Sequence, residues 1–364
     1  MKHLSRFIGI AALVAAAALA FTACSDGGGN DGPPLYIITG SGTEFSATLG
    51  GATIGDADQS IQAVIDGIRD DAAGRAVTIR FGEEGQTLDI GSAWVNFTST
   101  DGDWGTITLT GSITSANGVT AQGTIAIAGM VNINSSANIT NSSSSTNTLS
   151  KAIMHNGTGT LTISGGTIQN MGNSTNNLAI RSDSSGTLII SGGTVQTNSG
   201  RSILRENGLL RISGDTIITS ANTDAGSATI SLSTNARLIM EGGTVRNTAT
   251  SGLPRAIHIT STHAQVITIS GGTVGAMTAE GNGTIGIAIF HTGDSGTITI
   301  SGGTVTSANN TNQGTIMLVR NTGGTLTING GTVQNTGSGP AITVTGGDNN
   351  RVTINSGTVT PTFP

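Results

Sequence analysis

The sequence is poor in cysteine, in aromatic residues and in charge. Its 364 residues include one cysteine, 3% aromatic residues and 10% charged residues. A single cysteine excludes an intramolecular disulfide framework and any zinc site built from several thiolates. One compact globular core of this size would normally contain more aromatic side chains. Glycine, in contrast, is abundant, with 56 residues.

Basic residues are too few and too scattered for a protein that binds nucleic acid. The net charge is −6, and Lys151 is the only lysine beyond residue 2. Binding to nucleic acid requires clustered Lys and Arg side chains that neutralise phosphates. We therefore expect no nucleic-acid partner.

The N-terminus has the pattern of an export signal. Two basic residues precede an apolar stretch over residues 7–21, which is followed by small residues and Cys24. This is the order of a secretory signal peptide, and the stretch is shorter than the roughly 20 residues of a membrane span. We expect residues 1–23 to be a cleaved signal peptide and residues 24–34 to be a flexible Gly-rich tether that begins with the cysteine.

The residues Phe21, Thr22, Ala23 and Cys24 resemble a lipobox, the cleavage motif of bacterial lipoproteins. The resemblance implies that Cys24 is lipidated and becomes the new N-terminus. Phe21 departs from the usual leucine, a looseness that is similar to spirochaete lipoproteins. A plain secretory signal with a chance cysteine is the alternative. Because no second hydrophobic span follows, the lipid would be the only membrane attachment, and we expect an exported protein anchored in the outer membrane or at the cell surface.

One phrase of eight residues recurs eight times after residue 160. The phrases are LTISGGTI (161–168), LIISGGTV (188–195), LRISGDTI (210–217), LIMEGGTV (238–245), ITISGGTV (267–274), ITISGGTV (298–305), LTINGGTV (326–333) and VTINSGTV (352–359). Their alternation of apolar and polar residues is typical of strands, and the glycines permit a turn with positive φ between two strands. A period of about 27 residues corresponds to one coil of a three-sided solenoid.

A third apolar segment precedes each phrase by about ten residues and completes the coil. These segments are AIM (152–154), LAI (178–180), SIL (202–204), TISL (229–232), AIHI (256–259), IAIF (287–290), IMLV (316–319) and AITV (341–344). Stacked coils place each strand about 4.8 Å from its counterpart and line the interior with aliphatic ladders. The sequence therefore predicts an all-β fold, a single-stranded right-handed parallel β-helix (solenoid) over residues 106–364.

Residues 35–105 are expected to cap the start of the solenoid. Apolar residues at helical spacing over 58–74 predict an amphipathic helix that covers the first coil and stops at Gly74. The aromatic residues nearest the first coil are expected to fill its mouth: Trp94, Phe97 and Trp104. The last coil has no matching cap, so end-to-end self-association through it is expected.

The glycine-cornered coils resemble the pectate-lyase-like β-helix superfamily. Phrases of the SGGTV type are also similar to repeat surface lipoproteins of spirochaetes and gut bacteria. The resemblance covers residues 106–359 and implies the fold and exposure at the cell surface, but it is not specific for a function.

The sequence shows no constellation that is typical of an enzyme or a metal site. Carboxylates beyond residue 105 occur at different offsets from the glycine corners, and no GxSxG elbow is present. Asp56 and Asp58, like Asp101 and Asp103, have the spacing of calcium-loop ligands, but the other EF-hand residues are missing. We expect them to form an Asx turn and a helix N-cap. No catalytic residue, metal or cofactor is predicted.

The candidate ligand site consists of His155, Arg181, His291 and Arg320. Each lies eleven or twelve residues before the second corner glycine of its coil. This placement predicts a broken polar stripe along one edge, able to meet the carboxylate or sulfate groups of an acidic glycan. Solvated turn residues are the alternative. His258 is out of register with the stripe.

Three classes of function are left open. The leading hypothesis is a non-enzymatic cell-surface lipoprotein, an adhesin-like or spacer module that presents its loops to a glycan, a host surface or another envelope protein. The second is a polysaccharide lyase or glycoside hydrolase of the β-helix type, which three acids on one face of the fold would favour. The third, an autotransporter-like passenger, has the least support. The sequence does not specify the ligand or partner.

Overall fold

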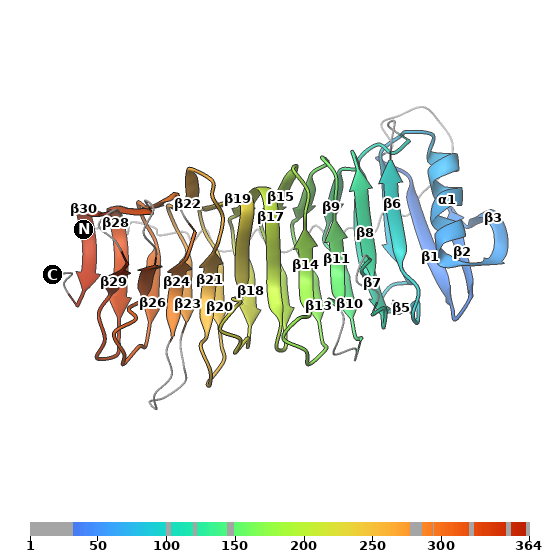
Figure 1. Ribbon diagram of the computed structural model, residues 1–364. Helices are drawn as coiled ribbons and strands as arrows, with labels where there is room; N and C mark the ends of the chain where they lie inside the picture. Colours follow the sequence, from blue (N-terminus) through green and yellow to red (C-terminus); the bar gives the residue numbers. More distant parts are fainter. Residues whose placement is uncertain are drawn as a thin grey trace, which may run out of the picture. The chain divides into compact units, whose positions relative to one another are not determined.

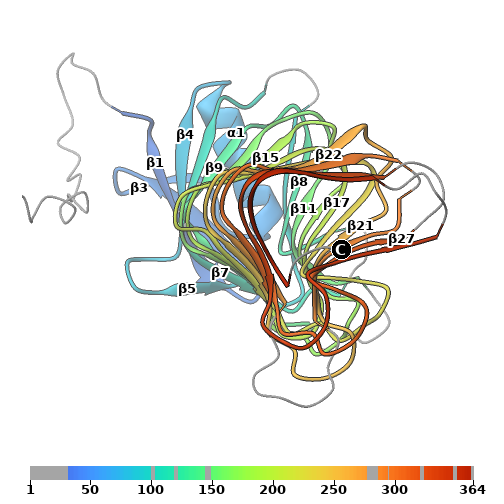
Figure 2. The same ribbon diagram turned by 90° about the vertical axis from the view of Figure 1, so that its left-hand side faces the viewer.

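The computed structural model describes residues 32–99, 103–118, 122–143, 149–276, 286–293, 295–319, 324–346 and 351–361. Residues 33–364 form one compact unit, in which stacked strands make a β-solenoid and the described residues contain one helix. The predicted all-β solenoid is confirmed, and its right hand stays a prediction. Figure 1 shows the coils following one another from the helix to the last strand, and Figure 2 shows them end-on. We call the three sides of the coil side 1, side 2 and side 3, in chain order.

Side 1 contains the third apolar segment of each coil. Its strands pair in parallel from coil to coil. They are β6 (Val95–Ser99), β8 (Ile125–Gly129), β11 (Lys151–His155), β14 (Leu178–Ser182), the first half of β17 (Arg201–Ile212), the first half of β19 (Ile230–Met240), β21 (Arg255–Ile259), β24 (Ile287–His291), β27 (Ile316–Val319) and β29 (Ile342–Thr345).

Side 2 contains the first half of each repeated phrase and is also parallel. Its strands are β1 (Leu35–Ser41), β4 (Val77–Phe81), the first half of β7 (Ile107–Ser115), β9 (Ile133–Ser135), β12 (Leu161–Ile163), β15 (Thr187–Ile190), the second halves of β17 and β19, β22 (Gln265–Ile269), β25 (Thr297–Ile300), and the first halves of β28 (Thr325–Asn335) and β30 (Arg351–Thr360).

Side 3 follows the glycine corner and is parallel as well. Its strands are β5 (Thr87–Asp89), the second half of β7, β10 (Asn138–Asn141), β13 (Thr167–Asn170), β16 (Thr194–Thr197), β18 (Ile217–Ser220), β20 (Thr244–Asn247), β23 (Thr273–Ala276), β26 (Thr304–Ser307) and the second halves of β28 and β30.

The corner between sides 2 and 3 requires glycine for two reasons. Gly193 has a φ of 75°, in the left-handed region that favours glycine. A Cβ atom there would also lie 2.5 Å from the carbonyl oxygen of Gly166 in the preceding coil. In the first phrase Gly166 has a positive φ. The corner therefore depends on the backbone close approach of stacked coils as well as on the turn itself.

The interior consists of aliphatic ladders, as the repeats predict. On side 2, Leu161 pairs with Leu188 and Ile163 with Ile190, and on side 3, Ile168 pairs with Val195. These side chains are 0–1% exposed. Burial of each such side chain stabilises the fold by about 1.5–3 kcal/mol, so the ladder supplies hydrophobic stabilisation coil by coil.

The N-terminal cap combines three strands and the helix. β1, β2 (Glu44–Leu49) and β3 (Ala52–Gln59) form an antiparallel meander, and α1 (Ile61–Ala72) buries its apolar face, as predicted. The helix begins later than expected, because Ser60 and not Asp58 is the N-cap residue: its hydroxyl accepts the Ala63 N–H.

The structure also places the predicted aromatic residues and tethers the helix. Phe97 packs edge-to-face on Trp104 at a centroid distance of 5.8 Å, and Trp94 is half-buried. The Tyr36 hydroxyl donates a hydrogen bond to Asp71. Burial and this bond raise the Tyr36 pKa to about 12. The bond joins β1 to the helix.

One side chain on the helix pairs with backbone groups at the open edge of side 1. The Gln62 side chain lies beside β6, the first strand of this side. Its Nε2 donates to the Asn96 carbonyl oxygen at 3.1 Å, and its Oε1 accepts the Asn96 N–H at 2.8 Å. The amide thus makes both hydrogen bonds that a neighbouring strand would make to Asn96.

The C-terminal coil is more exposed than the interior coils. β30 pairs with β28 along one edge, and Ile354, which continues an interior ladder, is 42% exposed. No described residue covers this coil. Self-association through this edge stays a prediction.

Replacing Gln62 should weaken the N-terminal cap. We expect Gln62→Ala to lower the free energy of unfolding by about 1–2 kcal/mol, because the Asn96 N–H and C=O lose their partners. Urea denaturation followed by circular dichroism measures this change. Gln86→Ala is the control, since Gln86 is exposed and should change stability by less than about 0.5 kcal/mol. Equal effects of the two variants would contradict this role for Gln62.

Candidate functional site

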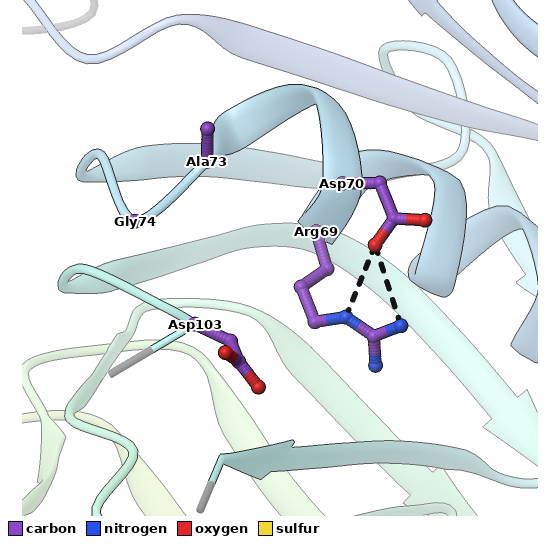
Figure 3. A pocket seen from close by; sticks show the side chains of 5 residues that line it. All are labelled: Arg69, Asp70, Ala73, Gly74 and Asp103. Carbon is purple, nitrogen blue, oxygen red and sulfur yellow. Dashed lines mark hydrogen bonds and ion pairs between the residues drawn. The ribbon is translucent and has the colours of Figure 1, made fainter. Parts of the chain in front are cut away.

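One hollow in the described residues lies beside the cap, and its arginine is already engaged by carboxylates. Figure 3 shows its lining residues, Arg69, Asp70, Ala73, Gly74 and Asp103. The Arg69 guanidinium is already paired, at 3.1 Å from Asp66 and 3.4 Å from Asp70. Asp103, one of the predicted Asx-turn residues, lies in this wall; Asp101 is outside the described residues.

A second hollow lies along side 3, from β5 to β16, and is lined mainly by hydroxyl and amide side chains. Two of its amides are engaged in a ladder. Gln196 donates to Gln169 at 2.9 Å, and Gln169 donates to Thr140 at 3.0 Å. This ladder leaves few unpaired groups for a ligand.

Side 1 carries buried and partly buried charged side chains. Their positions are described relative to one interior isoleucine that recurs in each coil. Ile153, Ile180, Ile203, Ile230 and Ile257 are paired from strand to strand and are 0–1% exposed. The residue two positions after this isoleucine is also buried. The residue one position after it belongs to the outer face. The residue two positions before it begins the strand, where the alternation is broken, and its side chain also reaches the outer face: the Arg255 guanidinium lies against the ring of Phe290, the strand partner of His258.

The structure does not bring the predicted stripe together. His155 and His291 each stand two positions after the interior isoleucine, and they are buried, at 0% and 2% exposure. Arg181 stands one position after its isoleucine, on the outer face, where it is half-buried. Arg320 is outside the described residues. A difference of one residue therefore separates the two histidines from Arg181, because neighbouring positions in a strand face opposite ways.

The two buried histidines are part of the interior. His155 Nδ1 lies 3.0 Å from the Ser182 hydroxyl, which also accepts a hydrogen bond from Arg205. Arg205 is completely buried and donates to the carbonyl oxygens of Gly186 and Leu209. Desolvation, with a smaller contribution from Arg205, lowers the His155 pKa to about 4. This stack is a polar interruption of the aliphatic core, inaccessible to a ligand.

Arg181 is neutralised within the outer face. Its guanidinium lies 3.0 Å from Asp183 and 3.1 Å from Glu206. Hydrogen bonding to Asp183 raises the Arg181 pKa. Two of the carboxylates that seemed scattered in the sequence thus meet around one arginine.

Two other arginines on this face, Arg201 and Arg255, have no such partner. Each stands two positions before its interior isoleucine. Neither guanidinium has a hydrogen-bond or ion-pair partner among the described residues; Arg201 Nε and the Nε and Nη1 atoms of Arg255 are buried and unpaired. Arg255 is 6% exposed. Desolvation lowers the pKa of both, that of Arg255 to about 10.

Surrounding groups hold Arg255 in place but do not neutralise it. The Asn247 amide donates to the Arg255 carbonyl oxygen at 3.0 Å and fixes the start of β21. The Arg255 guanidinium carbon lies 3.8 Å from the centroid of the Phe290 ring. A ring stabilises the face of the cation, and Nη2 is the one guanidinium nitrogen of Arg255 that is not among the buried, unpaired atoms. Asp224 acts electrostatically on both Arg201 and Arg255 without an ion pair to either.

His258 belongs to this outer face, although the sequence register excluded it. It occupies the position equivalent to Arg181, pairs with Phe290 in the next coil, and packs against that ring at 5.1 Å. Its Nε2 is 3.1 Å from the Thr292 hydroxyl. Desolvation, with a contribution from Arg255, lowers its pKa to about 4. The histidine is therefore neutral at pH 7 and adds no charge to the arginines.

Unpaired guanidinium groups of this kind are suited to bind anions. Within the described ranges no group of three His, Cys, Asp or Glu side chains could hold a metal ion, and no helix there is long and apolar enough to cross a membrane.

Comparison with protein families, curated proteins and solved structures finds no match. The site must therefore be interpreted from its own geometry.

Three histidines whose pKa values are lowered by desolvation should make the fold sensitive to acid. Desolvation lowers the pKa values of His155, His258 and His291 to about 4, whereas in the unfolded chain histidine titrates near 6.5. As the pH falls, the unfolded state binds these protons first. The stabilisation is thus complete above about pH 6.5 and is lost between about pH 6.5 and 4.

Urea midpoints measured at intervals from pH 7.5 to 4 test this prediction. The midpoint should fall across that window in the wild type and fall less steeply in His155→Gln. An unchanged slope in the variant would show that His155 does not contribute.

Proposed function

We propose that this protein is a non-enzymatic surface lipoprotein, anchored through Cys24, and that the outer face of side 1 binds an acidic glycan. The observation that supports the proposal is a pair of guanidinium groups, on half-buried Arg201 and buried Arg255, that have no anionic partner in contact. The lipoprotein part rests on the N-terminal motif, and the binding part rests on the solenoid.

An anion is the ligand class that fits unpaired guanidinium groups. Removing a cation from water costs several kcal/mol unless a partner replaces the lost hydration. A carboxylate or sulfate supplies both the opposite charge and acceptors for the N–H edge of arginine. The Phe290 ring already occupies one face of Arg255, so an anion would meet its guanidinium through the N–H groups, of which those on Nη2 are the least enclosed.

A glycan fits this face better than a peptide strand does. The strands of side 1 are paired with neighbours on both sides over the coils concerned, so a peptide cannot add to the sheet as another strand. The Ser231 hydroxyl, which lies between the arginine-bearing coils, is buried without a hydrogen-bond partner. A sugar hydroxyl could complete that hydrogen bond.

The lyase hypothesis has one supporting observation on the same face. Desolvation lowers the Lys151 pKa to about 8, in the range of a general base. However, Lys151 is completely buried and its Nζ donates to the Gln122 carbonyl oxygen at 3.1 Å. A base must reach the proton that it removes, so this geometry favours binding over cleavage.

Binding should require both arginines. We expect the full-length protein to bind polygalacturonate, alginate or hyaluronan, and Arg201→Gln or Arg255→Gln to weaken binding about tenfold each, because each loses charged hydrogen bonds. Equilibrium binding measured at two salt concentrations tests this. Arg237→Gln, a substitution of an exposed arginine on side 2, is the control with the same change in charge.

Parallel assays separate the competing functions. Binding that Arg237→Gln weakens as much as Arg255→Gln would indicate general charge attraction. Equal affinity for polyglutamate would contradict a glycan ligand. New sugar ends in the same incubations would replace the binding proposal with an enzyme.

The membrane anchor has its own test. We expect Cys24→Ser to abolish incorporation of labelled fatty acid and to move the protein from the membrane fraction to the soluble fraction, because the thiol is the only acylation site in the lipobox-like motif. Unchanged membrane association would contradict anchoring through Cys24. Ser25→Ala is the neighbouring control.

A further inference from the structure

The two unpaired arginines have a defined separation along the solenoid. Arg201 stands two positions before Ile203, and Arg255 two positions before Ile257. Ile230 pairs with both isoleucines, so exactly one coil lies between the arginines, and Ala228 occupies their position in it. Two strand spacings correspond to about 10 Å along the axis.

The intervening coil provides no cation on side 1. Ala228 is completely buried, and the Asp224 carboxylate acts electrostatically on both arginines. Asp224 is held in its loop by the Gly226 N–H at 2.9 Å and the Ser227 hydroxyl at 3.4 Å. Along this stretch of side 1, a coil without a cation therefore separates the positive charges of Arg201 and Arg255, and the negative charge of Asp224 acts on both arginines.

We infer that the ligand is a linear glycan that lies along the solenoid axis and carries an acidic group on every second sugar. This inference rests on the proposed function. An extended pyranose chain advances by close to one strand spacing per sugar, so acids on alternate sugars would face Arg201 and Arg255. An acid on the intervening sugar would face the Ala228 coil and be repelled by Asp224.

Defined oligosaccharides test the spacing by calorimetry on the full-length protein. Hyaluronan tetrasaccharide has acids on alternate sugars, and tetragalacturonate has one on every sugar; a hyaluronan disaccharide has a single acid. We expect the hyaluronan tetrasaccharide to bind at least tenfold more tightly than the disaccharide, because the second contact is intramolecular. It should also bind at least tenfold more tightly than tetragalacturonate.

Three variants assign these differences to named residues. Arg201→Gln and Arg255→Gln should each remove the gain from disaccharide to tetrasaccharide, whereas Arg237→Gln should keep it. Asp224→Asn should strengthen tetragalacturonate binding and reduce the preference for the alternating ligand. Arg255→Lys retains the charge and provides a second variant if Arg255→Gln does not fold, as judged by circular dichroism; it should keep part of the gain.

The outcomes separate this inference from the proposed function. Arginine-dependent binding with equal affinity for both tetrasaccharides would overturn the spacing and leave the proposed function standing. Absence of binding to every acidic oligosaccharide and polysaccharide would overturn both.

Discussion

The structure depends on the parallel pairing of each coil with the next. Because that pairing fixes the distance between coils, it also fixes which side chains stack. Leu161 must lie beside Leu188. At the corners, a backbone oxygen of the preceding coil lies so close to the glycine that a Cβ atom would clash with it. The same constraint means that a polar side chain in the interior interrupts an aliphatic ladder and needs hydrogen-bond partners within the solenoid. The stack of His155, Ser182 and Arg205 meets that need with hydrogen bonds inside the solenoid.

Most of the solenoid could be predicted because its information is local and repeated. The phrase from Leu161 to Ile168 contains two strands and the corner between them, and the structure confirms that division in β12 and β13. The helix was predicted from its apolar spacing, but its first residue was not, because Ser60 and Asp58 are both good N-cap residues. The contact of Gln62 with β6 joins residues far apart in the sequence, and no local pattern indicates it.

The candidate site was harder to predict, and the reason is the choice of reference residue. Counting back from the glycine corner crosses a loop that varies in length, so His155 and Arg181 seemed equivalent although they face opposite sides of the strand. Counting from the interior isoleucine removes that error. It places Arg201 and Arg255 in one column and His258 with Arg181 in another. The absence of partners for the arginines could not be read from the sequence, because it depends on how Asp183, Glu206 and Asp224 fold around them.

The single coil between Arg201 and Arg255 has a consequence for how such a protein can change. Coils of nearly equal length can be gained or lost by duplication or deletion without breaking the pairing of their neighbours. Loss of residues 228–254 would bring the two arginines onto adjacent strands, and duplication of that segment would move them one strand further apart. Ligand choice in this architecture can therefore shift in discrete steps through changes in repeat number, with no substitution at a contact residue.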